Sequence, residues 1–291
     1  MQPLARYREF DPCPPLREYV HCFFTFTVPA GIDEPRRPIR RELLYGAPGS
    51  YTTPLFADSQ VSISFSFGSG YRVEGLWGPA ESRHCGHVIG AMSAAHPAAH
   101  GEPIVEVGAY FCAAQARHFV QIPACELTDR ILPLSDLWGA SAVSLENRIG
   151  EARSDDQRVR RLELALIERL GSAASHGSAV NVSALTAYVQ QRRGTVSVVE
   201  LADSAGVSRQ HLRRIFQEEV GMPPKLFCRL ARFRAALARA ARDVKDDGAG
   251  LAAELGYADQ SHMIAEFREF SGLTPKPLML HQRVHPFMEL S

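Results

Sequence analysis

The first 130 residues or so carry short apolar runs, broken by Gly and Pro, of the kind that form β-strands. In VSISFSFGSG the hydrophobic residues fall on one face of a strand and three serines on the other. Similar runs occupy residues 20–28, 87–92 and 104–112, and a short helix is expected in AAQARHFVQI, ended by Pro123. The pattern predicts an open or barrel-like antiparallel sheet and leaves its strand order undetermined.

From Leu137 onward the hydrophobic period becomes that of a helix. In RVRRLELALIERL the apolar positions form one stripe with charges opposite; its members are Val159, Leu162, Leu166 and Leu170. The stripe could be a dimer interface or could pack on the chain's own sheet, and the pattern favours neither.

A domain boundary is expected at GSAASHGSA, residues 171–179, whose small polar composition is typical of a linker. Residues 184 to about 281 have a helical pattern. We therefore predict an α+β protein of two domains. The first, residues 1–172, is a β-rich sensor-like or dimerisation domain with C-terminal helices, and the second, residues 180–291, is all-α.

Composition and charge indicate the cellular compartment of the protein but say little about its function. Net charge is zero, and from residue 178 onward 15 Lys and Arg oppose 12 Asp and Glu, too mild an excess to indicate nucleic acid by itself. No apolar signal-peptide core and no run of 18 apolar residues is found, and the six cysteines form no CxxC pair. We expect a cytoplasmic protein with reduced thiols and no membrane contact.

The segment VVELADSAGVSRQHLRRIF, residues 198–216, has the pattern of a helix-turn-helix unit. Such a unit needs a small residue where the helices cross and Gly in the turn, and Ala202 and Gly206 meet both needs. Ser208 is placed to cap the second helix. The contact positions are apolar, namely Leu201, Ala205, Val207, Leu212 and Ile215.

Burial of the apolar side of this second helix turns four polar residues outward: Arg209, Gln210, Arg213 and Arg214. In a major groove Arg can bridge guanine O6 and N7, and Gln can bridge adenine N6 and N7. A solvated surface of an ordinary helical pair would show the same residues, so one such match leaves both interpretations open.

A second match follows in LAAELGYADQSHMIAEF, where Ala252 lies four residues before Gly256. Met263 and Phe267 take the buried positions, and the second turn is one residue longer than the first. Between the units, residues 224–242 predict one long helix that begins at Pro224. A rod of 19 residues spans roughly 28 Å, close to the roughly 34 Å between successive major-groove segments on one face of B-DNA.

These residues resemble the AraC/XylS family of bacterial transcription regulators. The resemblance covers about 100 residues and includes both helix-turn-helix units, the joining helix, GYADQSH and the GLTP that follows the last long helix. It implies an all-helical DNA-binding domain with its two units in adjacent major grooves. ELTDRILPLSDLWG, residues 126–139, resembles a sensor-type domain of one subgroup, which brings no defined ligand.

The resemblance implies double-stranded operator or promoter DNA as the partner and no cofactor. It leaves open RNA polymerase, a small-molecule effector and a second copy of the chain as further partners, and the choice between activator and repressor. The residues expected at the DNA are Ser208, Arg209, Gln210, Arg213, Arg214, Gln260, Ser261, His262, Ile264 and Arg268.

One position departs from the family pattern. Members often carry Arg two residues after the apolar residue that starts the buried face of the second recognition helix, and here Ala265 stands there. Phosphate contacts from Arg268, Lys276 and the amides near Asp259 would remain. We therefore expect sequence discrimination to be concentrated in the first unit.

Other side chains suggest weaker hypotheses. The motif HCGH could contribute to a metal site through His84, Cys85 and His87. No second cysteine pair supplies the remaining ligands, so ordinary loop or strand roles are favoured for these residues. Glu106 could face a cavity or water. Aromatic residues could line an effector pocket but fit a plain core better; they are Phe65, Phe67, Trp77, Tyr110 and Trp138.

No nucleophile–base pair and no phosphate-binding glycine loop is found in the sequence, so we expect no enzyme activity. The alternative is a small-molecule binding protein or enzyme whose helical module binds a partner other than DNA. Salt-dependent binding to specific duplex DNA would discriminate between the two.

Overall fold

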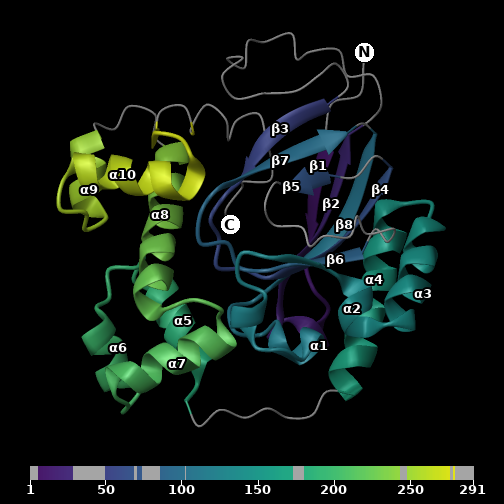
Figure 1. Cartoon of the computed structure of the whole chain (residues 1–291), viewed down its shortest axis with the longest axis horizontal. Helices are drawn as coiled ribbons and strands as arrows, with labels where there is room; N and C mark the ends of the chain where they lie inside the picture. Colours follow the sequence, from purple (N-terminus) through teal and green to yellow (C-terminus); the bar gives the residue numbers. More distant parts are fainter. Residues whose placement is uncertain are drawn as a thin grey trace.

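The computed structural model describes residues 6–28, 50–68, 71–73, 86–101, 103–172, 180–242, 248–275 and 278. Within them the chain is α+β with two domains, a β-rich first part and an all-helical second part, as predicted (Figure 1). Each part has a cluster of buried apolar side chains, and the cluster of the helical part also includes Ala57 and Ala91 of the N-terminal part. In the described parts of the chain, no helix combines the length and hydrophobicity needed to cross a membrane.

The N-terminal domain is built on two antiparallel sheets. The six-stranded sheet has the order β1-β2-β8-β4-β6-β9, formed by Arg6–Phe10, Val20–Val28, Ile104–Phe111, Ser62–Gly68, Gly86–Ile89 and Ile131–Pro133. The three-stranded sheet has the order β3-β7-β5, formed by Ser50–Leu55, His96–Gly101 and Tyr71–Val73. The strands predicted at residues 20–28 and 104–112 are confirmed, and residues 87–92 shorten to β6.

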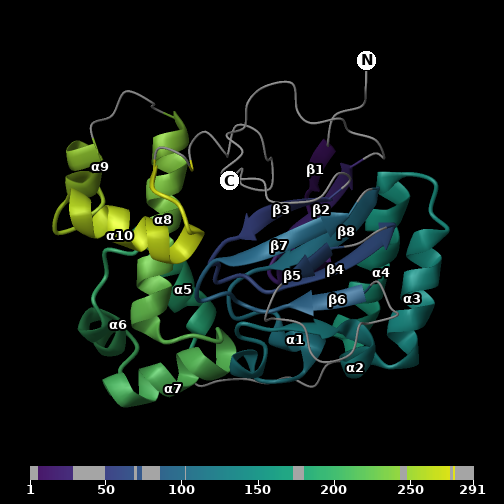
Figure 2. The ribbon, with the colours of Figure 1, turned by 45° about the horizontal axis from the view of Figure 1, so that its top comes forward.

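Helices cover one face of the six-stranded sheet. They are α2 (Leu134–Trp138), α3 (Ala140–Gly150) and α4 (Asp155–Ser172), and the three-stranded sheet lies on the other side (Figures 1 and 2). The apolar stripe of α4 is buried in the cluster that contains Phe23, Val107 and Phe111. This answers the question that the sequence left open, because the stripe packs on the chain's own sheet.

The short helix expected before Pro123 is only α1, Arg117–Val120. It ends at Gln121, whose φ of 58° is left-handed. A 3-10 turn, Ala124–Glu126, follows. Residues of this region lie against the second domain.

The C-terminal domain consists of α5 (Val182–Gln191), α6 (Val198–Ser204), α7 (Arg209–Glu219), α8 (Pro224–Arg242), α9 (Gly248–Glu254) and α10 (Gln260–Ser271). The long helix α8 has the predicted bounds and joins the α6–α7 pair at one end to the α9–α10 pair at the other (Figure 1). Its buried side chains, including Phe227, Leu230 and Phe233, bind the two pairs into one core.

Candidate nucleic-acid interface

The first helix-turn-helix unit is formed by α6 and α7. The Ser197 hydroxyl caps α6 by accepting from the backbone N–H of Glu200 at 3.1 Å. Ala202 is buried at the helix crossing. Gly206 makes the turn at φ +65°, a left-handed conformation that other residues adopt only with strain. Ser208 then caps α7 through the N–H of His211 at 3.2 Å, as the sequence predicts.

Helix α7 has one buried and one exposed face. Leu212, Ile215 and Phe216 are buried, so the side chains of Ser208, Arg209, Gln210, Arg213 and Arg214 all lie at the surface. Arg214 pairs with Glu218 at 3.3 Å, whereas Arg209 and Arg213 form no ion pair with any described residue. The exposed start of α7 therefore offers two uncompensated guanidinium groups beside an amide side chain.

The second unit, α9 and α10, repeats this design. Gly256 makes the turn at φ +71°, and Asp259 caps α10 by accepting from the N–H of His262 at 2.7 Å. Met263 and Phe267 are buried as expected. The exposed residues of α10 include Gln260, Ser261, His262, Ala265 and Arg268. Ile264 is half-buried, so its side chain offers less surface than the sequence pattern implied.

A cluster that the sequence analysis missed holds α10 on α8. The guanidinium of Arg229 bonds to Glu266 Oε1 at 2.6 Å and to both carboxylate oxygens of Glu269, and it lies over the Phe270 ring at 4.8 Å. Glu266 is buried, so its charge needs this partner. Two carboxylates three residues apart on α10 were the available signal, but no periodicity indicates which arginine they meet.

The sequence analysis also missed the contacts between the two domains. At the end of α7, Arg117 pairs with Glu219 at 2.8 Å and the Thr128 hydroxyl donates to the carbonyl oxygen of Gly221 at 2.6 Å. On α8, Arg234 pairs with Asp58 at 2.8 Å. At the end of α10, the N–H of Ala57 donates to the Phe270 carbonyl oxygen at 2.8 Å. The N-terminal domain therefore touches the C-terminal end of both candidate recognition helices.

Gly221 allows the close approach at α7. It follows the helix at φ +91°, and a Cβ atom built there would lie 2.6 Å from Thr128 Oγ1 and 2.9 Å from the Ala124 oxygen. Any larger residue would meet the N-terminal domain. Gly272, which ends α10 at φ +72°, has no atom within 4 Å of such a Cβ. The two recognition helices thus end on similar glycines in different surroundings.

The metal site and the aromatic effector pocket considered from the sequence fall partly on described residues. Of the three residues considered for a metal site, His87 is buried on β6, and His84 and Cys85 lie outside the described residues. Trp77, considered for an effector pocket, also lies outside them. Among the residues that are described, no three His, Cys, Asp or Glu side chains gather as a metal site. Trp138 is core, donating to the Phe119 carbonyl oxygen at 3.0 Å.

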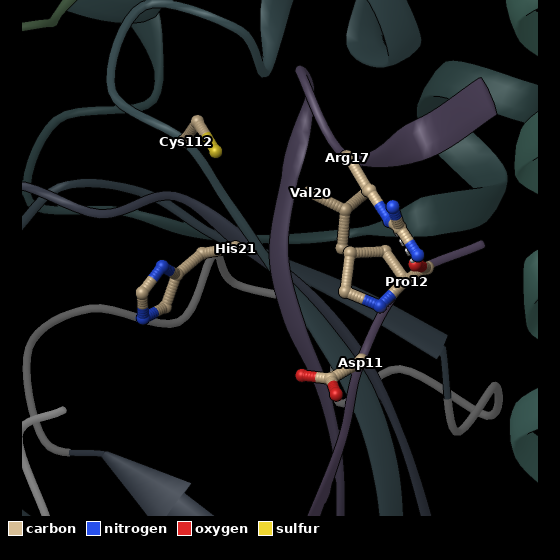
Figure 3. Close-up of a pocket in the computed structure, with 6 residues that line it drawn as sticks. All are labelled: Asp11, Pro12, Arg17, Val20, His21 and Cys112. Atoms are coloured by element: carbon tan, nitrogen blue, oxygen red, sulfur yellow. Dashed lines mark hydrogen bonds between the residues drawn. The ribbon is translucent and has the colours of Figure 1, made fainter. Parts of the chain in front are cut away.

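A small pocket of about 300 Å³ opens at the start of β2 (Figure 3). It is lined by Asp11, Pro12, Arg17, Val20, His21 and Cys112, and its charged side chains are of mixed sign. Asp11, Arg17 and His21 are exposed. Such an open, mixed-charge lining does not define a ligand class.

Comparison with known proteins relates each part of the chain to a separate family model. A model described as a helix-turn-helix domain matches residues 201–279, and one described as a domain of unknown function, DUF6597, matches residues 8–133. An uncharacterized HTH-type transcriptional regulator of Haemophilus influenzae is 31% identical over 93 residues, which are 32% of this chain. The match spans about a third of that relative's length, 31%.

Two solved structures are similar over most of the chain. The crystal structure of ToxT from Vibrio cholerae O395 has a TM-score of 0.43 at 9% identity, covering 80% of this chain and 98% of that one. The AraC-like transcriptional activator CuxR has a TM-score of 0.27 at 11% identity, covering 74% and 80%. At these scores neither likeness carries a conclusion about function.

The helix-turn-helix match covers the region that contains both turn glycines, α8 and the exposed starts of α7 and α10. Residues 201–279 of the chain therefore match a helix-turn-helix domain, and part of the chain is similar to an HTH-type transcriptional regulator.

Proposed function

We propose that this protein is a sequence-specific DNA-binding transcriptional regulator. In this proposal residues 180–291 bind double-stranded operator or promoter DNA, and residues 1–172 sense a small molecule or dimerise. The observation that carries it is the pair of helix-turn-helix units, each with a capped recognition helix whose first turn is polar and exposed, held apart by one continuous helix. The same proposal locates the protein in the cytoplasm, together with its DNA partner.

The geometry of α8 supports binding of both units to one duplex. Its 19 residues give a rod of roughly 28 Å, which suits two major-groove segments roughly 34 Å apart on one face of B-DNA. The Arg229 cluster and the shared core keep the two units from swinging independently. The binding energy of one unit then helps to place the other.

The contacts between the domains supply a route for regulation. Because the N-terminal domain touches α7, α8 and α10, a change in its conformation alters groups that set the relative position of the two units. We propose that the signal received by residues 1–172 acts on DNA binding through these contacts.

Arg213→Ala and Arg214→Ala are each expected to weaken operator binding by about 1–3 kcal/mol and to relax preference at one or two base pairs. Both side chains are exposed on α7, and Arg213 has no ion-pair partner among the described residues. The measurement is binding of the full chain to the operator and to single-base variants. Arg148→Ala, an exposed arginine of α3, is the control and should leave affinity unchanged.

The pattern of loss separates the interpretations of the first unit. An equal loss on all sequences would assign these arginines to phosphates rather than base edges. Unchanged affinity for both variants would remove α7 from the interface. A protein that uses its helical module for another partner would bind all duplexes alike.

The second unit is expected to discriminate bases less than the first. Ala265 is exposed on α10 and has no hydrogen-bonding group, so scrambling the operator half beneath α10 should cost less than scrambling the half beneath α7. Ala265→Arg should raise affinity and steepen its salt dependence through an added phosphate or guanine contact.

The test of the second unit is binding of systematically mutated duplexes at two salt concentrations. Equal or greater discrimination in the half beneath α10 would show that Gln260, Ser261 and His262 read bases without the arginine. Ala265→Ser, which adds no charge, is the matched control and should leave the salt dependence unchanged.

A further inference from the structure

A row of serines on β4 is buried although its sequence pattern is that of a half-exposed strand. Ser62, Ser64 and Ser66 alternate with Ile63, Phe65 and Phe67, and the hydrophobic residues face the helices. In such a strand the polar face normally meets water. Here the three serines are 4%, 0% and 7% exposed. The face away from the helices is therefore both covered and polar.

The register of the sheet places a carboxylate on the same face. Glu106 of β8 lies directly opposite Ser66 on one side and Phe26 on the other. It is 7% exposed, and no ion pair joins it to any described residue. The Ser64 hydroxyl is close enough to favour its ionised form. However, neither Ser64 Oγ nor Ser66 Oγ makes a hydrogen bond of normal geometry in the described structure.

Two other glutamates are buried in the described part of the chain, and both have partners that compensate their charge. Glu163 accepts from the backbone N–H of Cys13 at 2.9 Å and pairs with Arg160, and Glu266 pairs with Arg229. Glu106 has no comparable partner among the described residues, and burial raises its pKa to about 7. A buried carboxylate without a cation, beside unsatisfied hydroxyls, is unfavourable for folding and is typical of a binding site.

Aromatic rings complete the surroundings of the carboxylate. The Phe24 ring lies over Gly108, where a Cβ atom would come within 2.4 Å of the Phe24 Cζ. Phe24 stacks on Tyr110 with ring centroids 4.8 Å apart. Tyr110 and Glu106 flank Gly108 on the same face of β8. Aromatic faces beside a carboxylate are the combination that proteins use for organic cations.

We infer that Glu106, with Ser64 and Ser66, binds the protonated amine of a small organic ligand whose apolar part lies against Phe24 and Tyr110. A cationic nitrogen supplies the charge that Glu106 lacks and N–H donors for both serine hydroxyls. The inference rests on the proposed regulation by a small molecule and names the chemical class of that molecule.

The position of this site connects it to the second domain. Burial, with the charges of Glu106 and Asp58, raises the pKa of Tyr110, while Arg234 opposes the rise. The charges of Glu106, Asp58 and Arg234 thus all act on Tyr110. Tyr110 therefore lies within electrostatic range of both the amine site and the Asp58–Arg234 ion pair, which joins the N-terminal domain to α8. A ligand at Glu106 changes the charge that this pair experiences.

The test uses the full chain and three matched probes: phenethylamine as the cation, 2-phenylethanol as the neutral analogue and 3-phenylpropionate as the anion, extended by a series of primary alkyl and aryl amines. Thermal shift and calorimetric titration report binding. We expect amines to bind and raise the melting temperature, the alcohol to bind at least tenfold more weakly, and the anion not to bind.

Two variants locate the site. Glu106→Gln should weaken amine binding at least tenfold and leave the alcohol unaffected. Glu163→Gln removes an equally buried carboxylate on the helix-covered side and should leave amine binding intact. Absence of binding by every amine, equal binding of the three probes, or equal loss in both variants would overturn the inference.

DNA binding separates this inference from the function on which it rests. A protein that binds its operator through Arg213 but takes no amine contradicts the amine site alone. If the protein binds the amine at Glu106 but shows no preference among duplexes, the proposed regulatory function is contradicted and the amine site still holds.

Discussion

Gly221→Ala is expected to lower the free energy of unfolding by about 3 kcal/mol and to separate the two domains at the end of α7. Two effects add. The left-handed φ of +91° costs a residue with a Cβ about 1–2 kcal/mol. The new methyl group also meets Thr128 Oγ1 and the Ala124 oxygen, so the Thr128–Gly221 hydrogen bond is lost.

Gly272→Ala is the matched control for this variant. It places the same methyl group at the end of α10, at φ +72°, with no atom within 4 Å. Backbone strain without a contact should cost only about 1–2 kcal/mol. Amide hydrogen exchange over residues 124–130 should quicken in Gly221→Ala and stay unchanged in Gly272→Ala. Equal exchange in both variants would mean that α7 and the N-terminal domain do not depend on this contact.

Glu106→Gln is expected to stabilise the ligand-free protein at pH 8 by about 3 kcal/mol. Burial raises the folded-state pKa of Glu106 from 4.5 to about 7, so the folded protein holds this proton more tightly than the unfolded chain. The stability associated with the neutral carboxyl is complete below about pH 4.5 and is lost as the pH rises through about 7. Because Gln is neutral at every pH, the Glu106→Gln variant keeps this stability at pH 8.

The pH profile is the measurement that matters for Glu106. The difference in stability between Glu106→Gln and the parent protein should be small near pH 5 and largest at pH 8. Both tryptophans, Trp77 and Trp138, belong to the N-terminal part, so their fluorescence follows unfolding of the domain that contains Glu106. Glu163→Gln should lose stability instead, because Glu163 is paired. A difference that does not grow with pH would contradict the buried, uncompensated carboxylate.

The C-terminal domain was largely predictable because its rules are local. A turn glycine, a capping serine and a helical stripe lie within a few residues of each other, and each acts through its neighbours along the chain. Thus the turn at Gly206, the cap at Ser208 and the bounds of α8 all follow from the sequence. The roles of the exposed residues at DNA stay predictions, since exposure is necessary for contact but does not establish it.

The N-terminal domain was predictable only as strands. Alternation on β4 indicates which residues share a face, but it cannot tell whether the polar face meets water or a second sheet, because that depends on residues far away in the sequence. Ser64 shows the difference, being fully buried. The contacts of Thr128 and Asp58 with the second domain carry no periodic signal for the same reason.

The docking of the N-terminal domain against the ends of both α7 and α10 has a consequence for operator architecture. Inserting a single base pair between the half-sites rotates one of them around the duplex and demands a different relative setting of the two helices. The docked protein resists this change more than a protein released from the N-terminal contacts, in which the shared core on α8 alone holds the two units. Docked and undocked forms then differ in which spacings they accept. By thermodynamic reciprocity, a duplex of the favoured spacing stabilises the docked form as much as that form favours the duplex. The spacing of a promoter would thus influence the N-terminal domain as a bound ligand does, through contacts made at the DNA.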